Sequence, residues 1–500
     1  MSADTAAQAP KPSLSRANQA ASLLRWLPLA LLLAILAGLA FTPKLLGDPD
    51  TYWHIATGQW ILEHGRAPST DPFSFTFHGA PWTAHEWLSE VVYALAYRAG
   101  GWSGVLLLAS MVFVGGLAIL AGYAARHLPP LGVSALILFA FFAAVPSILA
   151  RPHILAFPLL AVWLTELLKA RADARTPPPW LLLIMVAWAN LHGSFLLGLA
   201  LLGAFALEAV LVARRGNLKR EILRWAVFGA GSIVAAVVTP HGPQGILFPL
   251  TFVDMQAFKV VDEWRSADFS RLTIFEILLL EGLFLTFWLG VKIPPFRIFL
   301  LLGLLHLALK HERHQAVFGL GAGALLVEPI AAALGERRRQ DGQPASAVAD
   351  RGRIEVAPNP VMKPVVIAAA LLLVCWARLS TPHARIDDVT PAAAFGKVPK
   401  HLRSQPVFND YDFGGFLIFE GVRPFIDSRA DMYGDAFVMD HDAIMRDPER
   451  RLRPTLARWG VRWTILRPQS SAVGVLDRTS WCRRLSADAY AVVHACNPKR

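Results

Sequence analysis

Charged side chains are scarce in this chain, and their scarcity excludes an ordinary soluble protein. Of the 500 residues, 17% are Asp, Glu, Lys or Arg, whereas 54% are hydrophobic. Soluble domains carry about a quarter charged residues. Because apolar runs of membrane length recur along the chain, the composition predicts a polytopic α-helical membrane protein.

Cysteines, a cleavable leader and features of nucleic-acid binding are also lacking. Of three cysteines, Cys375 lies in an apolar run, and Cys482 and Cys496 lie in the polar tail, where they can pair if the tail is outside the cell. The first apolar run is long, follows a polar arm and lacks a small-residue cleavage site, so we expect no cleaved signal peptide. The net charge of +11 comes from basic residues in short loops, which indicates topology rather than a nucleic-acid partner.

About 11 transmembrane helices are predicted from the apolar runs. They cover residues 26–41, 102–124, 131–149, 153–169, 179–191, 194–213, 225–239, 272–290, 297–309, 315–334 and 363–380. Lys and Arg gather in every second connection, which the positive-inside rule assigns to the cytoplasm. We therefore expect a multi-pass protein of the bacterial inner (cytoplasmic) membrane, with a cytoplasmic N-terminus and a periplasmic C-terminal domain.

Polar stretches divide the chain further. We expect a disordered cytoplasmic arm at 1–25, a transmembrane domain at 26–335 with a large first external loop at 44–101, a cytoplasmic linker at 336–362, a last transmembrane helix at 363–380, and an extracytoplasmic α/β domain at 381–500. In that domain the pattern predicts strands at 406–408, 416–419, 424–427, 461–466 and 490–494, and helices at 434–447 and 450–459. Residues 85–98 are predicted to form an amphipathic stretch that lies along the membrane interface.

The first external loop carries the strongest candidates for chemistry. Asp48 and Asp50 flank Pro49, and this extended spacing lets both carboxylates converge on one reacting group or cation. Carboxylates this close to hydrocarbon are costly unless they are paired, so they indicate function. The alternative is that Asp48 caps the following helix and Asp50 favours its N-terminal dipole. Glu86 is a further catalytic candidate and His85 a substrate-binding candidate, the alternative for Glu86 being the next helix N-terminus.

Polar residues at the other predicted external connections complete the candidate site. An arginine there can bind a phosphate bidentately, and polar breaks at membrane depth are tolerated only beside protein or a water-filled cavity. The alternative for the arginine is that it reaches to lipid headgroups. The substrate-binding candidates are Arg151, His153, Asn190, His192, His241, Glu263 and Arg313. In the tail, residues 409–415 and 424–431 line a ligand cleft or, alternatively, Gly414 and Gly415 only form a tight hairpin.

Several motifs resemble one family. They are DPDTYWHIATGQWIL, PWTAHEWL, RPH, NLHG, DEW, HERH, DFGGFL and FIDSRADMY, together with an acidic pair after the first span. These features are similar to the GT-C superfamily of integral membrane glycosyltransferases, and to a bacterial group of GT-C-like membrane proteins related to protein mannosyltransferases. The resemblance covers most of residues 26–495.

The resemblance implies a reaction and a set of partners. It implies transfer of a sugar from a polyprenyl-phosphate-linked donor to an envelope glycan, lipid or protein acceptor on the outer face, with membrane lipid as surroundings. Asp48 or Asp50 would be the general base or hold a divalent cation (Mg or Mn) at Asp50, and Glu86 would match a second external acid. The competing interpretations are a non-catalytic membrane protein that binds, flips or assembles lipid-linked glycans, and a ligase that modifies lipid A or a polymer.

Overall fold

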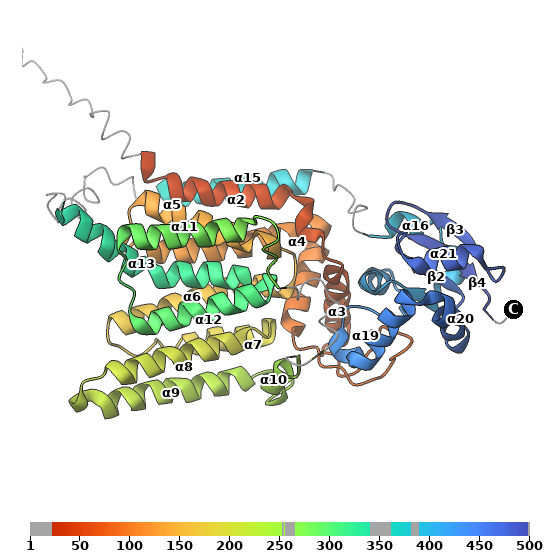
Figure 1. The fold of residues 1–500 in the computed structure, drawn as a ribbon, viewed down its shortest axis with the longest axis horizontal. Coiled ribbons are helices and arrows are strands. Elements are labelled where there is room, and N and C mark those ends of the chain that lie inside the picture. Colours follow the sequence, from red (N-terminus) through yellow and green to blue (C-terminus); the bar gives the residue numbers. More distant parts are fainter. Residues whose placement is uncertain (1–22, 253–254, 256–265, 341–361, 382–389, 499–500) are drawn as a thin grey trace, which may run out of the picture.

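The computed structural model describes residues 23–252, 255, 266–340, 362–381 and 390–498. Two sequence predictions, Glu263 and almost all of the linker at 336–362, therefore lie outside the described residues. So does nearly all of the N-terminal arm. The described chain forms a long helical bundle followed by a smaller region with a β-sheet (Figure 1).

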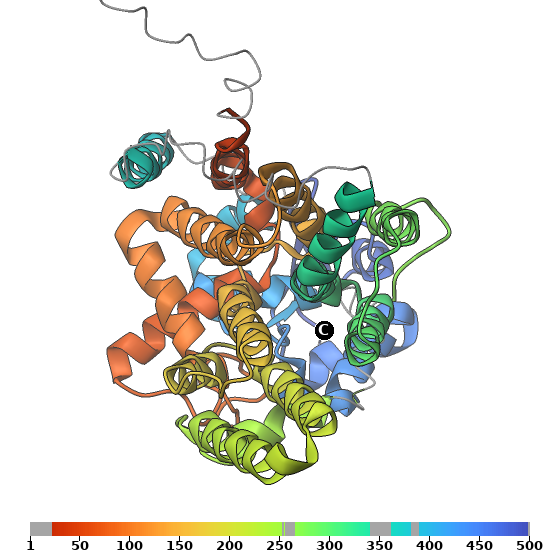
Figure 2. The same cartoon turned by 90° about the vertical axis from the view of Figure 1, so that its left-hand side faces the viewer.

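Each predicted transmembrane segment coincides with a helix. These helices are α2 (Leu27–Phe41), α4 (Trp87–Ala124), α5 (Pro130–Ala144), α6 (Pro152–Ala172), α7 (Leu181–Leu191), α8 (Phe195–Val212), α9 (Leu218–Val237), α11 (Ile274–Leu289), α12 (Pro295–Lys310), α13 (Gln315–Gln340) and α15 (Met362–Ser380). Their axes run roughly side by side, and Figure 2 shows the bundle from its end. Within the described residues, five helical segments are long and apolar enough to cross a membrane. The count of about 11 spans stays a prediction.

The outer surface of the bundle is apolar, as a lipid-facing surface requires. Large hydrophobic side chains are exposed on it, including Leu183, Leu211, Phe287, Phe299 and Leu372. The α8–α9 and α11–α12 connections and the C-terminal end of α13 lie at the bundle end remote from the sheet (Figure 1). These are basic connections, so the bundle has a basic end and an opposite end that carries the candidate site.

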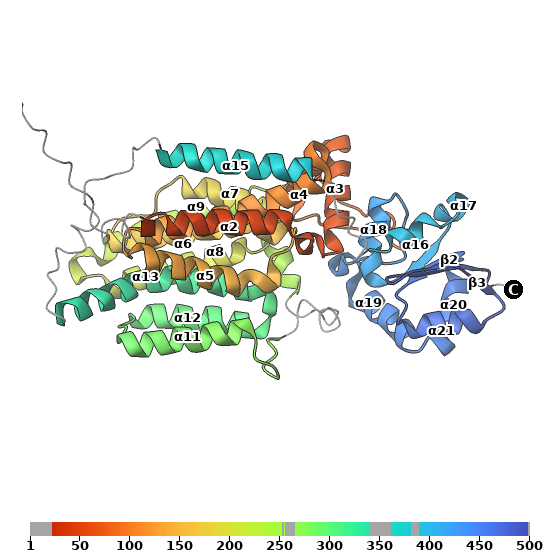
Figure 3. The same cartoon turned by 90° about the horizontal axis from the view of Figure 1, so that it is seen from above.

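Two helical segments lie across the end of the bundle that faces the sheet (Figures 1 and 3). They are α3 (Asp50–His64) and the first part of α4. α4 bends at Gly100 and Gly101, where Gly101 has a φ of 56°, a left-handed conformation that favours glycine. α3 and α4 pack closely because Gly58 has no side chain: a Cβ there would lie 1.9 Å from the Glu90 carbonyl oxygen.

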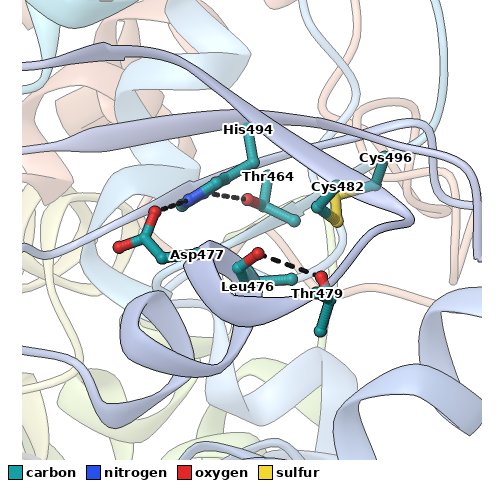
Figure 4. The surroundings of a disulfide bond; sticks show 7 residues. All are labelled: Thr464, Leu476, Asp477, Thr479, Cys482, His494 and Cys496. Carbon is teal, nitrogen blue, oxygen red and sulfur yellow. Dashed lines mark hydrogen bonds and ion pairs between the residues drawn. A yellow bond between two sulfur atoms is a disulfide. The ribbon is translucent and has the colours of Figure 1, made fainter.

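The C-terminal region contains a four-stranded sheet in the order β1-β2-β4-β3. The strands are β1 (Val407–Asn409), β2 (Trp463–Leu466), β3 (Cys482–Ala487) and β4 (Val492–Cys496); β1 and β2 are parallel and the other pairs antiparallel. The helices are α16 (Ala392–Gly396), α17 (Lys400–Arg403), α18 (Gly414–Phe419), α19 (Ala430–Arg446), α20 (Pro448–Arg458) and α21 (Ser471–Arg478). A disulfide joins Cys482 to Cys496 (Figure 4).

Two local predictions for this region are wrong. Residues 416–419 form the helix α18 rather than a strand, and residues 424–427 are irregular rather than a strand. The glycine pair that begins α18 makes no hairpin. A Cβ on Gly414 would lie 2.3 Å from the Ile426 carbonyl oxygen, and one on Gly415 would lie 2.5 Å from the Pro49 carbonyl oxygen. The two glycines therefore let α18 pack closely against Pro49, which lies between Asp48 and Asp50.

Candidate functional site

The acid pair lies at the start of α3 and is bound to Arg151. Asp48 and Asp50 are 3% and 6% exposed. One guanidinium nitrogen of Arg151 lies 3.1 Å from Asp48 Oδ2, and the other lies 2.5 Å from Asp50 Oδ2. Arg151 is positioned because it precedes Pro152 at the start of α6 in an extended conformation. Two buried carboxylates thus share one cation that comes from a segment about 100 residues away.

The remaining carboxylate oxygens of the pair also have partners. The Asp50 backbone N–H donates to Asp48 Oδ1 at 2.7 Å, so Asp48 satisfies the start of α3 as well as binding Arg151. The Ser428 hydroxyl donates to Asp50 Oδ1, and Trp53 Nε1 donates to Ser428 Oγ at 3.0 Å. The C-terminal region therefore reaches into the acid pair directly.

Glu86 forms a second cluster with two histidines. Its Oε1 lies 3.4 Å from His192 Nε2 and 3.7 Å from His85 Nε2. His192 Nδ1 accepts from the Ser194 backbone N–H at 3.1 Å, which places the proton of a neutral imidazole on Nε2, facing Glu86. Glu86 thus lies at the start of α4, beside the break between α7 and α8.

Burial sets the protonation of this cluster. It raises the pKa of Glu86 from 4.5 to about 7, although Arg151 and Arg313 act in the opposite direction. Burial also lowers the pKa of His85 and, together with Arg313, that of His192 well below its usual range. Both histidines are therefore neutral near pH 7, where Glu86 can accept or release a proton.

The other substrate-binding candidates lie around these clusters in different ways. His153 Nε2 contacts the Ser147 carbonyl oxygen at 2.7 Å, and its ring centroid lies 6.4 Å from that of His192. Arg313, in the short 3-10 helix η7 (Glu312–His314), acts electrostatically on Glu86 and His192. Glu263 is outside the described residues.

Asn190 and His241 are engaged with the protein itself. The Asn190 side chain accepts from Trp87 Nε1 at 2.8 Å and donates to the Val186 and Val238 carbonyl oxygens, so it joins α7 to α4 and to the end of α9. His241 Nε2 lies 3.1 Å from the Ala84 carbonyl oxygen. His85 and His241 line a small void together with residues at the C-terminal end of α7, at the start of α8 and just after α9. The contacts of Asn190 and His241 therefore indicate that these two side chains hold the segments around the site in place.

Every carboxylate oxygen of the acid pair already has a partner within the protein. All four carboxylate oxygens of Asp48 and Asp50 already bind Arg151, Ser428 or a backbone N–H. Among the described residues, no group of three His, Cys, Asp or Glu side chains could hold a metal ion. A cation at Asp50 would have to displace Arg151 or Ser428, and it stays a prediction.

The segment that follows Ser428 anchors the C-terminal region to the first loop. Arg429 is 1% exposed, binds Asp427 through two nitrogens at 2.7 Å each, and binds Asp71 at 2.9 Å. Its guanidinium lies over the Trp82 ring, 4.5 Å from the centroid. Asp431 lies two residues further on; burial raises its pKa, and His85 acts in the opposite direction. Ser428 and Asp431 are site residues that sequence reasoning did not single out, although both lie within the acidic stretch 424–431.

A buried pair connects the two acid-bearing helices. His54 and Glu90 are each 1% exposed, and His54 Nδ1 lies 3.6 Å from Glu90 Oε1. His54 follows Asp50 by one turn of α3, and Glu90 follows Glu86 by one turn of α4, so the two helices present matching polar positions. The burial of both side chains places this pair inside the α3–α4 interface.

No protein-family model and no curated protein matches this chain. Solved structures do match its fold. ArnT from Cupriavidus metallidurans bound to undecaprenyl phosphate aligns with a TM-score of 0.51 at 14% identity, over 96% of this chain and 98% of that chain. The oligosaccharyltransferase of Archaeoglobus fulgidus in the apo form aligns with a TM-score of 0.56 at 11% identity, over 89% of this chain and 69% of that chain.

A third match adds a second lipid-phosphate complex. AglB from Archaeoglobus fulgidus, in complex with an inhibitory peptide and a dolichol-phosphate, aligns with a TM-score of 0.50 at 12% identity, over 90% of this chain and 69% of that chain. At these identities the likeness shows the fold. The chain shares its fold with these ArnT and oligosaccharyltransferase structures, which agrees with the GT-C resemblance that the sequence motifs indicated.

Proposed function

We propose that this protein is a membrane glycosyltransferase that moves a sugar from a polyprenyl-phosphate-linked donor to an acceptor in the cell envelope. One observation carries the proposal. Two buried carboxylates, an arginine and a third carboxylate with a pKa near 7 lie at one end of an apolar helix bundle. That end is where a donor held by its lipid tail can present its phosphate, and the fold is shared with proteins solved with undecaprenyl phosphate and dolichol-phosphate.

Glu86 is the best general base among the three acids. A general base works best when its pKa is near the working pH, and burial brings Glu86 there. Asp48 and Asp50 are bound to Arg151, and an adjacent cation makes a carboxylate a weaker base. We therefore assign proton abstraction to Glu86, whereas the sequence alone had favoured Asp48 or Asp50.

The reaction then balances without further groups. Glu86 takes the proton of the acceptor hydroxyl, the acceptor oxygen bonds to the anomeric carbon, and the bond from that carbon to the lipid phosphate breaks. Arg151, oriented by Asp48 and Asp50, stabilises the charge on the departing phosphate. Attack from the face opposite the leaving group inverts the anomeric configuration.

The site belongs on the outer face of the membrane. Disulfides persist in oxidising compartments, and the Cys482–Cys496 disulfide lies in the region that contacts the acid pair. The basic connections lie at the other end of the bundle, which the positive-inside rule assigns to the cytoplasm. Both arguments support an external C-terminal domain and a cytoplasmic N-terminus.

The test is sugar transfer by the full chain reconstituted in liposomes with radiolabelled polyprenyl-phosphate sugars and envelope extract as acceptor. Asp48→Asn, Asp50→Asn and Glu86→Gln, made separately, should each lower transfer by about 10²-fold or more while leaving insertion unchanged. Glu63→Gln is the matched control, because Glu63 is exposed at the far end of α3. Transfer that survives all three changes would reject this cluster of acids as the catalytic site. Donor binding without turnover in the parent would instead support a protein that binds or flips the lipid-linked glycan.

A further inference from the structure

A cleft opens on the C-terminal region away from the acid site. Its volume is about 540 Å³, and it is lined by residues of α17, by the start of β3, by the end of β4 and by the segments around them. Figures 1 and 3 show these elements on the side of the C-terminal region that faces away from the helix bundle. Headgroups of the membrane around the bundle therefore do not reach the cleft. Its volume falls within the range of about 300–1,000 Å³ that is usual for ligand sites.

The charges that line the cleft are all basic. Arg462, Arg483 and His401 line it, and none of its lining residues is acidic. Arg462 donates to the neutral amide of Asn497 at 3.2 Å. Among the described residues, neither Arg462 nor Arg483 has a carboxylate partner in an ion pair.

Two arginines near the cleft on the same region are paired with acids. Arg484, the next residue on β3, binds Asp477 of α21, and Arg478 binds Glu449 at 2.6 Å. Successive side chains of a strand point to opposite faces, so Arg483 and Arg484 face different surroundings. Arg462 and Arg483 thus lie together at the cleft without a carboxylate partner among the described residues, and each can bind a carboxylate or phosphate bidentately.

The remaining lining groups suit a sugar. Trp481 offers an aromatic surface on which the apolar face of a sugar ring can pack. Gln405 and Asn497 supply amides, and Ser480 supplies a hydroxyl, each of which can bond to sugar hydroxyls. An aromatic ring, amides and unpaired arginines together define an acidic saccharide as the matching ligand.

The disulfide holds these groups in place. Cys482 and Cys496 both line the cleft, are opposite one another in the β3–β4 register, and are bonded (Figure 4). Arg483 directly follows Cys482, and Asn497 directly follows Cys496. The bond therefore restricts the positions of both residues. Groups fixed before binding lose less conformational entropy when the ligand arrives.

We propose that this cleft binds an acidic segment of the acceptor glycan, remote from the point of transfer. The proposal rests on the proposed function in one respect, which is that it identifies the bound glycan as the acceptor. The binding itself does not depend on catalysis. The shared chemistry is an anionic sugar, with the negative charge on a uronate carboxylate or on a sugar phosphate.

The experiment measures binding to the full chain in detergent by isothermal titration calorimetry. The probes are trigalacturonate, a phosphorylated maltotriose and neutral maltotriose. We expect one anionic probe to bind, and the neutral probe to bind at least tenfold more weakly. Tighter binding of trigalacturonate would identify a carboxylate as the source of the negative charge, and tighter binding of the phosphorylated maltotriose would identify a phosphate. Equal binding of neutral and anionic probes would overturn the proposal, and so would tighter binding of a thymidine trinucleotide.

Variants localise the binding. Arg483→Ala and Arg462→Ala should each weaken the anionic probe by about 10- to 100-fold, because each removes a charge-assisted hydrogen bond. Arg450→Ala is the matched control: Arg450 is exposed on α20 and does not line the cleft. Unchanged binding by both cleft variants would overturn the proposal. Thermal unfolding curves matching those of the parent exclude misfolding as the cause of a loss.

The two proposals fail separately. Glu86→Gln should bind the anionic probe as the parent does, because Glu86 lies in the other site. If the parent transfers sugar but neither anionic probe binds, the cleft proposal alone is wrong. If an anionic probe binds at the cleft and no transfer occurs under any donor, the enzyme proposal alone is wrong.

Discussion

The protonation of Glu86 gives the sharpest test of the proposed chemistry. With a pKa of about 7 in place of 4.5, its carboxylate form costs about 3 kcal/mol more in the folded protein than in water. As the general base, Glu86 must be ionised. We therefore expect transfer, measured as kcat/KM in liposomes, to fall about tenfold per pH unit below 7 and to level off above it.

Glu86→Gln should lower the rate by about 10²- to 10⁴-fold and remove this pH dependence. The neighbouring groups do not explain the same profile. Burial lowers the pKa of both His85 and His192 below the usual 6.5, so both histidines titrate at a lower pH than Glu86. A parent whose rate is flat from pH 5.5 to 8, or a Glu86→Gln variant that keeps the sloping limb, would refute the assignment of the base.

The pH dependence of the unfolding free energy gives an independent test of the raised pKa of Glu86. A carboxyl whose pKa is raised in the folded state stabilises the fold fully below pH 4.5, and this contribution is lost as the pH rises through 7. The difference in unfolding free energy between Glu86→Gln and the parent should therefore shift by about 3 kcal/mol in favour of the variant between pH 4.5 and 8. Thermal unfolding in detergent at both pH values measures it, and a pH-independent difference would contradict the raised pKa.

Three further changes test the packing around the site. Gly58→Ala should destabilise the protein by about 1–3 kcal/mol or more, because its Cβ would lie 1.9 Å from a backbone oxygen of α4; Gly38→Ala, with open space around it, should not, and a thermal shift assay compares them. Arg429→Met should cost about 3–5 kcal/mol, because it leaves buried carboxylates without their cation; limited proteolysis should then release the C-terminal region, and a protease-resistant variant would contradict this. Cys482→Ser with Cys496→Ser should cost about 3 kcal/mol of stability in the C-terminal region, and denaturant unfolding with and without reductant should show equal stability of parent and variant only in the reduced state.

Apolar runs were sufficient to predict the helices of the bundle. A membrane helix must form all its backbone hydrogen bonds within itself. A continuous apolar segment of sufficient length therefore predicts such a helix without knowledge of the rest of the fold. The failures are at tertiary contacts. Residues 416–419 have an apolar run typical of a buried strand, but Gly414 and Gly415 allow a helix to pack against Pro49, and that contact decides the structure.

The candidate site divides in the same way. Asp48, Asp50, Glu86 and Arg151 were identifiable because acids and arginines near apolar runs are costly without a role. Ser428 was not identifiable, because serine is common at loops and its partner Asp50 lies 378 positions away. The basicity of Glu86 was also not readable from sequence, since it depends on burial by segments that only the fold brings together.

The contact between Ser428 and Asp50 has a consequence for biosynthesis. The ribosome makes the serine 378 residues after Asp50, so a nascent chain that already contains all the helices of the bundle still lacks one hydrogen-bond partner of the acid pair. A truncated product would occupy the membrane without a finished centre. The surroundings of the acid pair are therefore complete only after the segment that carries Ser428 has been made and has folded onto the first loop.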